Sequence, residues 1–213
     1  KALTKRVVRD LGVPTPDFAV VERPEDADGV RLAYPLFAKP LAEGTGKGID
    51  AASKIETPAG LRTVCAGLLA RFHQPVLVEE FLPGREFTAG IVGTGAAAEV
   101  VGVMEVILNK QAEADAYSYV NKEECDDRVV YRLAEGDIDR ECRQVALKTW
   151  RGLGARDAGR VDLRVARDGK VSFIEVNPLA GLHPQHSDLP IICTMVGITF
   201  QQLIERIRAS AIR

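Results

Sequence analysis

Apolar residues along the chain follow two spacings, one typical of helices and one typical of strands. Residues 1–11 place apolar side chains three or four positions apart and stop at Gly12, which predicts a helix. Thr57 is a favourable N-cap residue and is followed by proline, so a second helix is expected from there. The same apolar spacing predicts two further helices, one after Asp137 and one after Thr199.

Short apolar or alternating runs bounded by glycine and proline predict strands. These runs are residues 18–21, 36–39, 49–52, 76–80, 86–92 and 99–108. The mixture predicts an α+β fold, divided into a small lobe over residues 1–92 and a C-terminal lobe over residues 93–213. Residues 109–127 are polar without a clear period and predict a long surface loop, which is typical of a functional lid.

The most informative segment is a predicted hairpin around Asp168 and Gly169. The alternating runs 160–165 and 173–177 flank this pair, and Asp-Gly between such runs predicts a two-residue turn. Counting outward from that turn puts facing pairs of residues close together across the two strands. The face opposite the apolar side chains then carries Arg160, Asp162, Glu175 and Asn177.

Asp162 and Glu175 would lie directly opposite each other in this hairpin. Like charges in facing positions are destabilising, so the arrangement favours a bound cation. Two carboxylates and the amide of Asn177 offer the oxygen ligands that suit Mg²⁺ or Mn²⁺. The alternative is an ordinary polar sheet face, in which Arg160 and Arg164 neutralise the carboxylates.

Two segments could handle a nucleotide. Lys39 ends a strand and is followed by a glycine-rich turn over residues 43–48, where backbone N–H groups could approach phosphate oxygens. The strand 76–80 leads to Glu86 and could offer an apolar slot for a flat heterocycle, with Glu86 accepting sugar hydroxyls. A flexible turn and solvated acids would give the same patterns.

The segment after Asn177 leaves the hairpin as a loop, so its groups would lie beside any bound metal. The backbone N–H of Gly181 is a candidate oxyanion donor, and Ser187 is a candidate donor to a substrate. His183 and His186 are better explained as loop histidines, because no third nitrogen or sulfur ligand has matching spacing.

Composition excludes several classes of protein. The 213 residues are 46% hydrophobic and 27% charged with a formal net charge of −2, which is typical of a globular protein and argues against a nucleic-acid partner. No apolar run approaches the length needed to span a membrane. The 4 cysteines form no C-x-x-C pair, which favours reduced thiols in the cytoplasm. The chain starts at Lys1 within a helical pattern and without Met, so we expect it to be part of a longer protein.

The order of these motifs resembles that of the ATP-grasp superfamily, and within it the D-alanine-D-alanine ligases. The resemblance rests on P-L-F-A-K-P, E-G-T-G-K-G, V-E-E-F-L-P-G-R-E, R-V-D-L and E-V-N-P, and it covers essentially the whole chain. It implies the ATP-grasp fold, two α+β lobes with ATP between them. The amino-terminal domain of that family would precede Lys1.

The resemblance also implies roles for single residues. ATP would contact Lys1, Lys39, Glu43, Gly44, Thr45, Gly46, Gly48, Glu79, Glu80, Leu82, Glu86 and Lys122. Asp162, Glu175 and Asn177 match the magnesium ligands. Arg160 and the N–H of Gly181 match groups that stabilise the tetrahedral intermediate, and Ser187 and Asp188 lie at the substrate carboxylate. Two residues depart from the usual pattern, Glu123 in place of a tyrosine and Asp188 in place of an aliphatic residue.

The implied activity is an ATP-dependent ligase that joins a carboxylate to an amine through an acyl phosphate, in peptidoglycan biosynthesis. Its partners would be small amino acids, with Mg²⁺ or Mn²⁺ as the metal, and a homodimer stays open. One alternative is a ligase for a different amino acid or peptide. The other is an ATP-binding module without catalytic activity.

Overall fold

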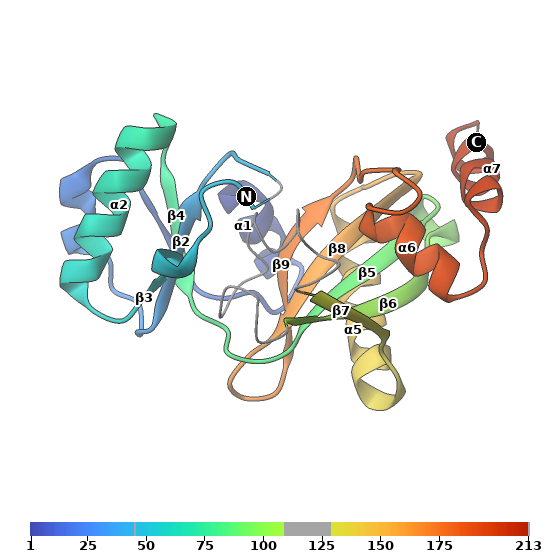
Figure 1. Cartoon of the computed structure of the whole chain (residues 1–213), viewed down its shortest axis with the longest axis horizontal. Helices are drawn as coiled ribbons and strands as arrows, with labels where there is room; N and C mark the ends of the chain where they lie inside the picture. Colours follow the sequence, from blue (N-terminus) through green and yellow to red (C-terminus); the bar gives the residue numbers. More distant parts are fainter. Residues whose placement is uncertain (45, 109–128, 213) are drawn as a thin grey trace. The chain divides into compact units, whose positions relative to one another are not determined.

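The computed structural model describes residues 1–44, 46–108 and 129–212, and the chain forms two compact units. The first unit is made mainly of residues 16–83, and the second of residues 4–15, 84–107 and 131–213. Of the helices predicted from the sequence, α1 (Ala2–Asp10), α2 (Pro58–Phe72), α5 (Gly136–Gly152) and α7 (Phe200–Ala211) are present (Figure 1). The predicted lid, residues 109–127, lies outside the described residues.

The first unit is a four-stranded antiparallel sheet with α2 packed against it. Its strand order is β1 (Phe18–Val21), β4 (Val76–Glu80), β2 (Leu36–Pro40) and β3 (Lys54–Ile55). The apolar side of α2 and one face of the sheet form its core, and Leu36, Leu61, Cys65 and Val78 are buried in it. The strand predicted over residues 49–52 is wrong: Ala51–Ser53 forms a 3-10 helix, because Asp50 caps it by accepting from the N–H of Ala52.

The second unit contains a five-stranded sheet in the order β7-β6-β5-β8-β9. Its strands are β5 (Glu86–Val92), β6 (Glu99–Leu108), β7 (Val129–Leu133), β8 (Ala158–Val165) and β9 (Val171–Asn177). β5 pairs with both β6 and β8, so it belongs to this second sheet. The predicted lobes 1–92 and 93–213 stay a prediction.

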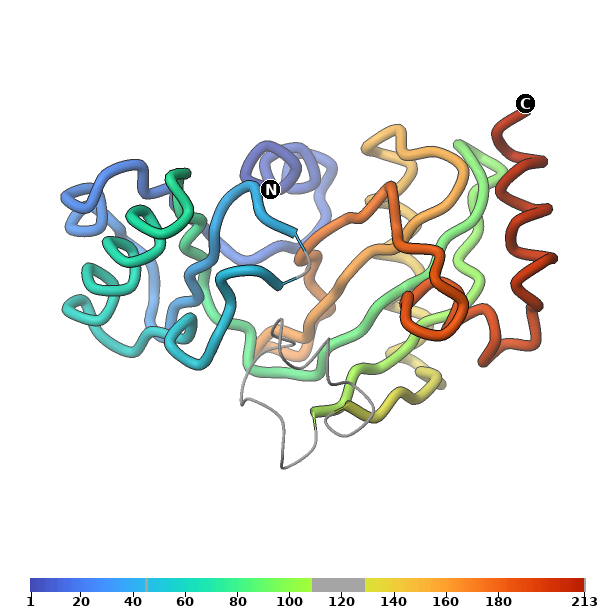
Figure 2. The backbone as a smooth tube through the Cα atoms, turned by 45° about the horizontal axis from the view of Figure 1, so that its top comes forward, coloured from blue at the N-terminus to red at the C-terminus, as the bar shows by residue number. Residues whose placement is uncertain are grey.

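Two helices pack against β5 and β8 (Figure 1). Alternate residues such as Phe87, Val161 and Leu163 join the core that contains Trp150 of α5. The intervening positions of the strands meet α6 (Asp188–Met195), a helix that the apolar spacing did not predict. Figure 2 shows the chain after β9 (orange) running into α6. The polar face of the predicted hairpin is therefore the face on the side of α6.

Two glycines let α6 approach this face of the sheet. A Cβ atom on Gly90 would lie 3.0 Å from Leu189 Cδ1, and one on Gly102 would lie 2.7 Å from Ile192 Cγ2. A Cβ atom on Gly102 would force a shift at the contact with Ile192, and one on Gly90 would be a tight contact with Leu189.

Gly102→Ala is expected to lower the free energy of unfolding by about 1–3 kcal/mol, because the added methyl overpacks the contact with α6. Urea denaturation measures the change. Gly67→Ala in α2 is the matched control: its Cβ would meet nothing within 4 Å, so alanine should stabilise that helix slightly. Equal effects of the two substitutions would contradict the close approach of α6.

Three cysteines among the described residues are buried free thiols, Cys65, Cys142 and Cys193. Burial raises the pKa of Cys65 and Cys193 to about 11 and that of Cys142 to about 12. Because only the thiolate reacts, and because these side chains are buried, iodoacetamide at pH 8 should leave all three unlabelled in the folded protein. Mass spectrometry of labelled peptides checks this, with urea-unfolded protein as the positive control. Labelling of any of the three before unfolding would contradict their burial.

Candidate functional site

In the hairpin of β8 and β9 the predicted carboxylates occupy facing positions, but the turn that joins the strands differs from the predicted one. Asp162 pairs with Glu175, and Arg160 pairs with Asn177, as predicted. The two-residue turn is wrong, however: the N–H of Ala166 donates to the carbonyl of Lys170, which encloses three residues in the loop. Only Gly169 of that loop has a positive φ, at 87°, which is typical of a three-residue hairpin loop.

A β-bulge compensates for the longer turn. Leu163 pairs with Phe173 and Asp162 with Glu175, so Ile174 is the extra residue on β9. Phe173 takes the core position expected for Ile174 and is 1% exposed. The turn shifts the register by one residue, and the bulge restores it before the carboxylates are reached.

Asp162 is the centre of a network of donors on the sheet face next to α6. The Thr88 hydroxyl donates to its Oδ1 at 3.2 Å, and Arg160 Nε donates to the same oxygen at 3.3 Å. Asn177 Nδ2 donates to its Oδ2 at 3.0 Å. The nitrogen end of the Asn177 amide therefore faces Asp162.

The donor set fits a hard divalent cation. Asp162, Glu175 and Asn177 present carboxylate and amide oxygens from adjacent strands, the ligands that Mg²⁺ and Mn²⁺ prefer. Within the described ranges, no cluster of three or more His, Cys, Asp or Glu side chains is arranged to hold a metal ion. The role of these three residues as metal ligands stays a prediction.

Arg160 lies between two carboxylates. Besides its bond to Asp162, its NH1 atom is 3.1 Å from Oδ2 of Asp188, the first residue of α6. All three side chains are largely buried, with 14% of Arg160, 19% of Asp162 and 9% of Asp188 exposed. The charge of Asp188, which departs from the family pattern, is thus directed at Arg160.

The loop between β9 and α6 places Gly181 beside Ser187. The Ser187 hydroxyl accepts from the N–H of His183 at 3.0 Å, and a Cβ atom on Gly181 would lie 2.6 Å from that hydroxyl oxygen. His183 and His186 are exposed, with ring centroids 4.6 Å apart. The proposed substrate roles of Gly181 and Ser187 stay predictions.

The first unit holds a second group of predicted residues. Lys39 Nζ is 2.5 Å from Glu79 Oε1, and both side chains are buried. Next to them Phe37 stacks on Phe81, with ring centroids 6.4 Å apart. Glu80 uses its backbone N–H to pair with Asp17, and Leu82 is buried.

The glycine-rich segment of the first unit forms two consecutive turns. The N–H of Lys47 donates to the carbonyl of Gly44, and the N–H of Ile49 donates to that of Gly46. Gly48 has a φ of 76°, and a Cβ atom there would lie 2.6 Å from Pro40 Cγ. Thr45, within this segment, lies outside the described residues.

The remaining predicted residues are placed separately. Glu43 accepts from Gln74 Nε2 at 3.0 Å, and Glu86 of β5 is 3.4 Å from Arg164 NH1. Lys1 precedes α1 and is partly buried. Lys122 and Glu123 lie outside the described residues.

Sequence reasoning missed Thr88 and the pairing of Asp188 with Arg160. Thr88 is buried on β5, and its partner in the sheet is Asp162 of β8. These two strands are far apart in the sequence, and no local pattern indicates that they pair. Asp188 reaches Arg160 only through the packing of α6.

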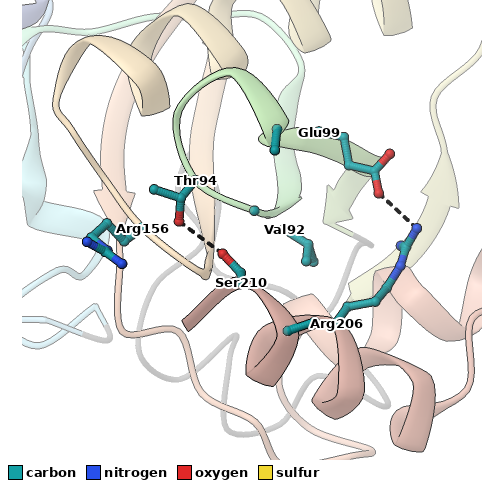
Figure 3. Close-up of a pocket in the computed structure, with 9 residues that line it drawn as sticks. Val92, Thr94, Glu99, Arg156, Arg206 and Ser210 are labelled. Carbon is teal, nitrogen blue, oxygen red and sulfur yellow. Dashed lines mark hydrogen bonds and ion pairs between the residues drawn. The ribbon is translucent and has the colours of Figure 1, made fainter. Parts of the chain in front are cut away.

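The described residues also line a hollow of about 380 Å³ between β5 and α7 (Figure 3). The hydroxyls of Thr94 and Ser210 are hydrogen-bonded to each other at its wall, 3.0 Å apart, and both donate to Asp157 Oδ1. Arg206 is paired with Glu99 at its side. None of the predicted site residues lines this hollow, so it is separate from the Asp162 network.

Comparison with known proteins identifies the family. The sequence profile described as "D-ala D-ala ligase C-terminus" matches residues 7–208. The chain belongs to this family. Among its relatives are D-alanine--D-alanine ligases of Cupriavidus necator, 33% identical over 99% of the chain and 63% of the relative, and of Bordetella pertussis, 33% identical over 99% and 65%.

Solved structures show the same fold. VanG D-Ala:D-Ser ligase from Enterococcus faecalis has a TM-score of 0.78 and 21% identity over 98% of the chain and 60% of that protein. D-alanine--D-alanine ligase from Bacillus anthracis, solved in complex with ATP, has a TM-score of 0.75 and 20% identity over 100% and 65%. These similarities confirm the predicted α+β ATP-grasp fold. The chain spans about 63% of the length of the first Cupriavidus relative.

None of the helices in the described ranges has the length and apolar character needed to cross a bilayer.

Proposed function

We propose that the protein containing this chain is an ATP-dependent ligase that forms an amide between a carboxylate and an amine, of the D-alanine-D-alanine ligase type. The observation that carries the proposal is the pairing of Asp162 with Glu175, beside Asn177 and Arg160. Family membership and the fold agree with it. Its small-molecule substrates would be ATP and two amino acids.

The reaction would proceed in two steps. A substrate carboxylate oxygen attacks the γ-phosphorus of ATP, which releases ADP and gives an acyl phosphate. The amine of the second substrate then attacks the acyl carbon, loses a proton and displaces phosphate to leave an amide. Asp162, Glu175 and Asn177 would hold a divalent cation, which would supply positive charge to offset that of the phosphates.

The chain's own groups would orient the substrates and stabilise charge. Arg160 and the N–H of Gly181 would face the oxyanion of the tetrahedral intermediate. In the first unit, Lys39 and Lys1 would contact phosphates, together with the turn that contains Glu43, Gly44, Thr45, Gly46 and Gly48. Glu79, Glu80, Leu82 and Glu86 would hold adenosine, and Lys122 would reach the γ-phosphate.

A second candidate keeps the chemistry and changes the acceptor. Asp188 is buried beside Arg160, close to Ser187, which is the proposed contact for the substrate carboxylate. Because Asp188 pairs with Arg160, less of the guanidinium charge is left for a substrate carboxylate, which would favour an acceptor of different charge. Ser187 and Asp188 are therefore the proposed determinants of the acceptor.

The test is Mg²⁺-dependent ADP release by the full-length protein, offered single D- and L-amino acids and pairs of them. ADP release together with a dipeptide from D-alanine alone would support the first candidate. Product only with other acceptors would support the second. ATP binding without ADP release across the panel would contradict both and favour a non-catalytic ATP-binding module.

The wider setting of the enzyme follows from this proposal. Ligation of D-alanine would serve peptidoglycan biosynthesis in the cytoplasm. The formal net charge of −2 argues against a nucleic-acid partner. Sedimentation of the full-length protein would show whether it forms a homodimer.

A further inference from the structure

The side chain of Arg160 poses an electrostatic problem for the proposed metal site. Its Nε is 3.3 Å from Oδ1 of Asp162, so a guanidinium charge lies next to a proposed metal ligand. A divalent cation on Asp162 would be repelled by this charge, and the guanidinium would compete for the same carboxylate. The largely buried setting screens the repulsion less than bulk water would.

Asp188 pairs with Arg160 and offsets the positive charge of its guanidinium. Its Oδ2 is 3.1 Å from NH1 of Arg160, on a different nitrogen from the one that faces Asp162. As the first residue of α6, its carboxylate is also stabilised by the helix N-terminus. Gly90 and Gly102 allow the close approach of α6 that brings it there.

Asp188 changes the balance of charge between Arg160 and its neighbouring carboxylates. Asp162, Glu175 and Asp188 carry three negative charges and Arg160 carries one positive charge, which leaves two negative charges. Arg164 and Glu86, 3.4 Å apart on the same two strands as Asp162 and Thr88, cancel each other. Without Asp188, the two carboxylates in the hairpin would have only one negative charge in excess of Arg160.

We infer that Asp188 is a positioning residue that holds and neutralises Arg160, so that Asp162 stays available to a divalent cation. The inference rests on the proposed function, since it requires the metal site at Asp162, Glu175 and Asn177. It assigns Asp188 a role in metal affinity, separate from any contact with the acceptor.

The test is the affinity of the full-length protein for Mn²⁺ without nucleotide, measured from the electron paramagnetic resonance signal of free Mn²⁺. Asp188→Asn should raise the dissociation constant for Mn²⁺ about tenfold. Substitutions of residues that orient metal ligands, without contacting the metal, have effects of this size. Asp168→Asn is the matched control, because it removes the same charge from the exposed hairpin loop, where Asp168 pairs with Lys170. This control should change the constant less than about twofold.

Two further variants separate positioning from a structural effect. Asp188→Glu keeps the charge and should bind Mn²⁺ nearly as the wild type does, even if Asp188→Asn folds poorly. In an Arg160→Gln background, Asp188→Asn should have a much smaller effect, because the charge to be neutralised is gone.

Each result has a distinct meaning. Wild-type protein that does not bind Mn²⁺ would contradict the proposed metal site itself. Wild-type binding that Asp188→Asn leaves unchanged would overturn only the role of Asp188. An equal effect of Asp188→Asn with and without Arg160 would overturn its action through the guanidinium.

Discussion

Glu175→Gln is expected to reduce Mg²⁺-dependent ADP release by the full-length protein by a factor of about 10³ or more. The substitution keeps the shape of the side chain and removes one of the two carboxylates that face each other across β8 and β9. Charge stabilisation by a metal is worth several kcal/mol in the transition state, so its loss has a large effect on kcat. A coupled assay of ADP release at saturating ATP measures it.

The control for this experiment is Asp168→Asn in the loop of the same hairpin. Its side chain is 55% exposed and paired with Lys170, so the substitution should leave turnover within about twofold of the wild type. Both variants should unfold at the same temperature. If Glu175→Gln turned over ATP as fast as Asp168→Asn, the metal site would have to lie elsewhere.

Lys39→Met is expected to lower the free energy of unfolding by about 3–5 kcal/mol. This is the usual cost of removing one partner of a buried ion pair while the other stays charged. Lys39 and Glu79 are 6% and 4% exposed, with 2.5 Å between Nζ and Oε1. Removing the ammonium leaves the Glu79 carboxylate in surroundings from which water is largely excluded. Urea denaturation of the full-length protein measures the loss.

Two controls show that the effect comes from the uncompensated charge. The double variant Lys39→Met/Glu79→Gln should recover much of the lost stability, because residue 79 then carries no charge. Lys170→Met removes a lysine from the exposed pair with Asp168 and should cost less than about 1 kcal/mol. A Lys39→Met variant as stable as Lys170→Met would show that the pair contributes nothing to stability, and ATP affinity would then be the only expected loss.

The pairing of Asp162 with Glu175 was predicted correctly although the turn and the strand next to it were not. The longer turn and the bulge each shift the register by one residue, and the two shifts cancel. The alternation on either side of Asp168-Gly169 correctly predicted that Asp162 faces Glu175. The turn has three residues and the bulge adds Ile174, and neither leaves a clear signal in the sequence. The core decided both, because Phe173 is buried there in the place expected for Ile174.

By itself, the sequence determined the elements whose signals are local. Caps, turns and apolar spacing set α2, the strands β4 and β5 and the polar face of the β8–β9 hairpin, because each depends on neighbours only a few residues away. The order of the motifs determined the family. These signals also named the carboxylates around which the proposed metal site is built.

Only the tertiary structure decided which distant residues complete that site. Thr88 reaches Asp162 because β5 pairs with β8, and Asp188 reaches Arg160 because α6 packs over Gly90 and Gly102. Such contacts arise from burying apolar surface shared by segments far apart in the chain, and no local spacing encodes them. The charge that surrounds Asp162 is therefore a property of the fold.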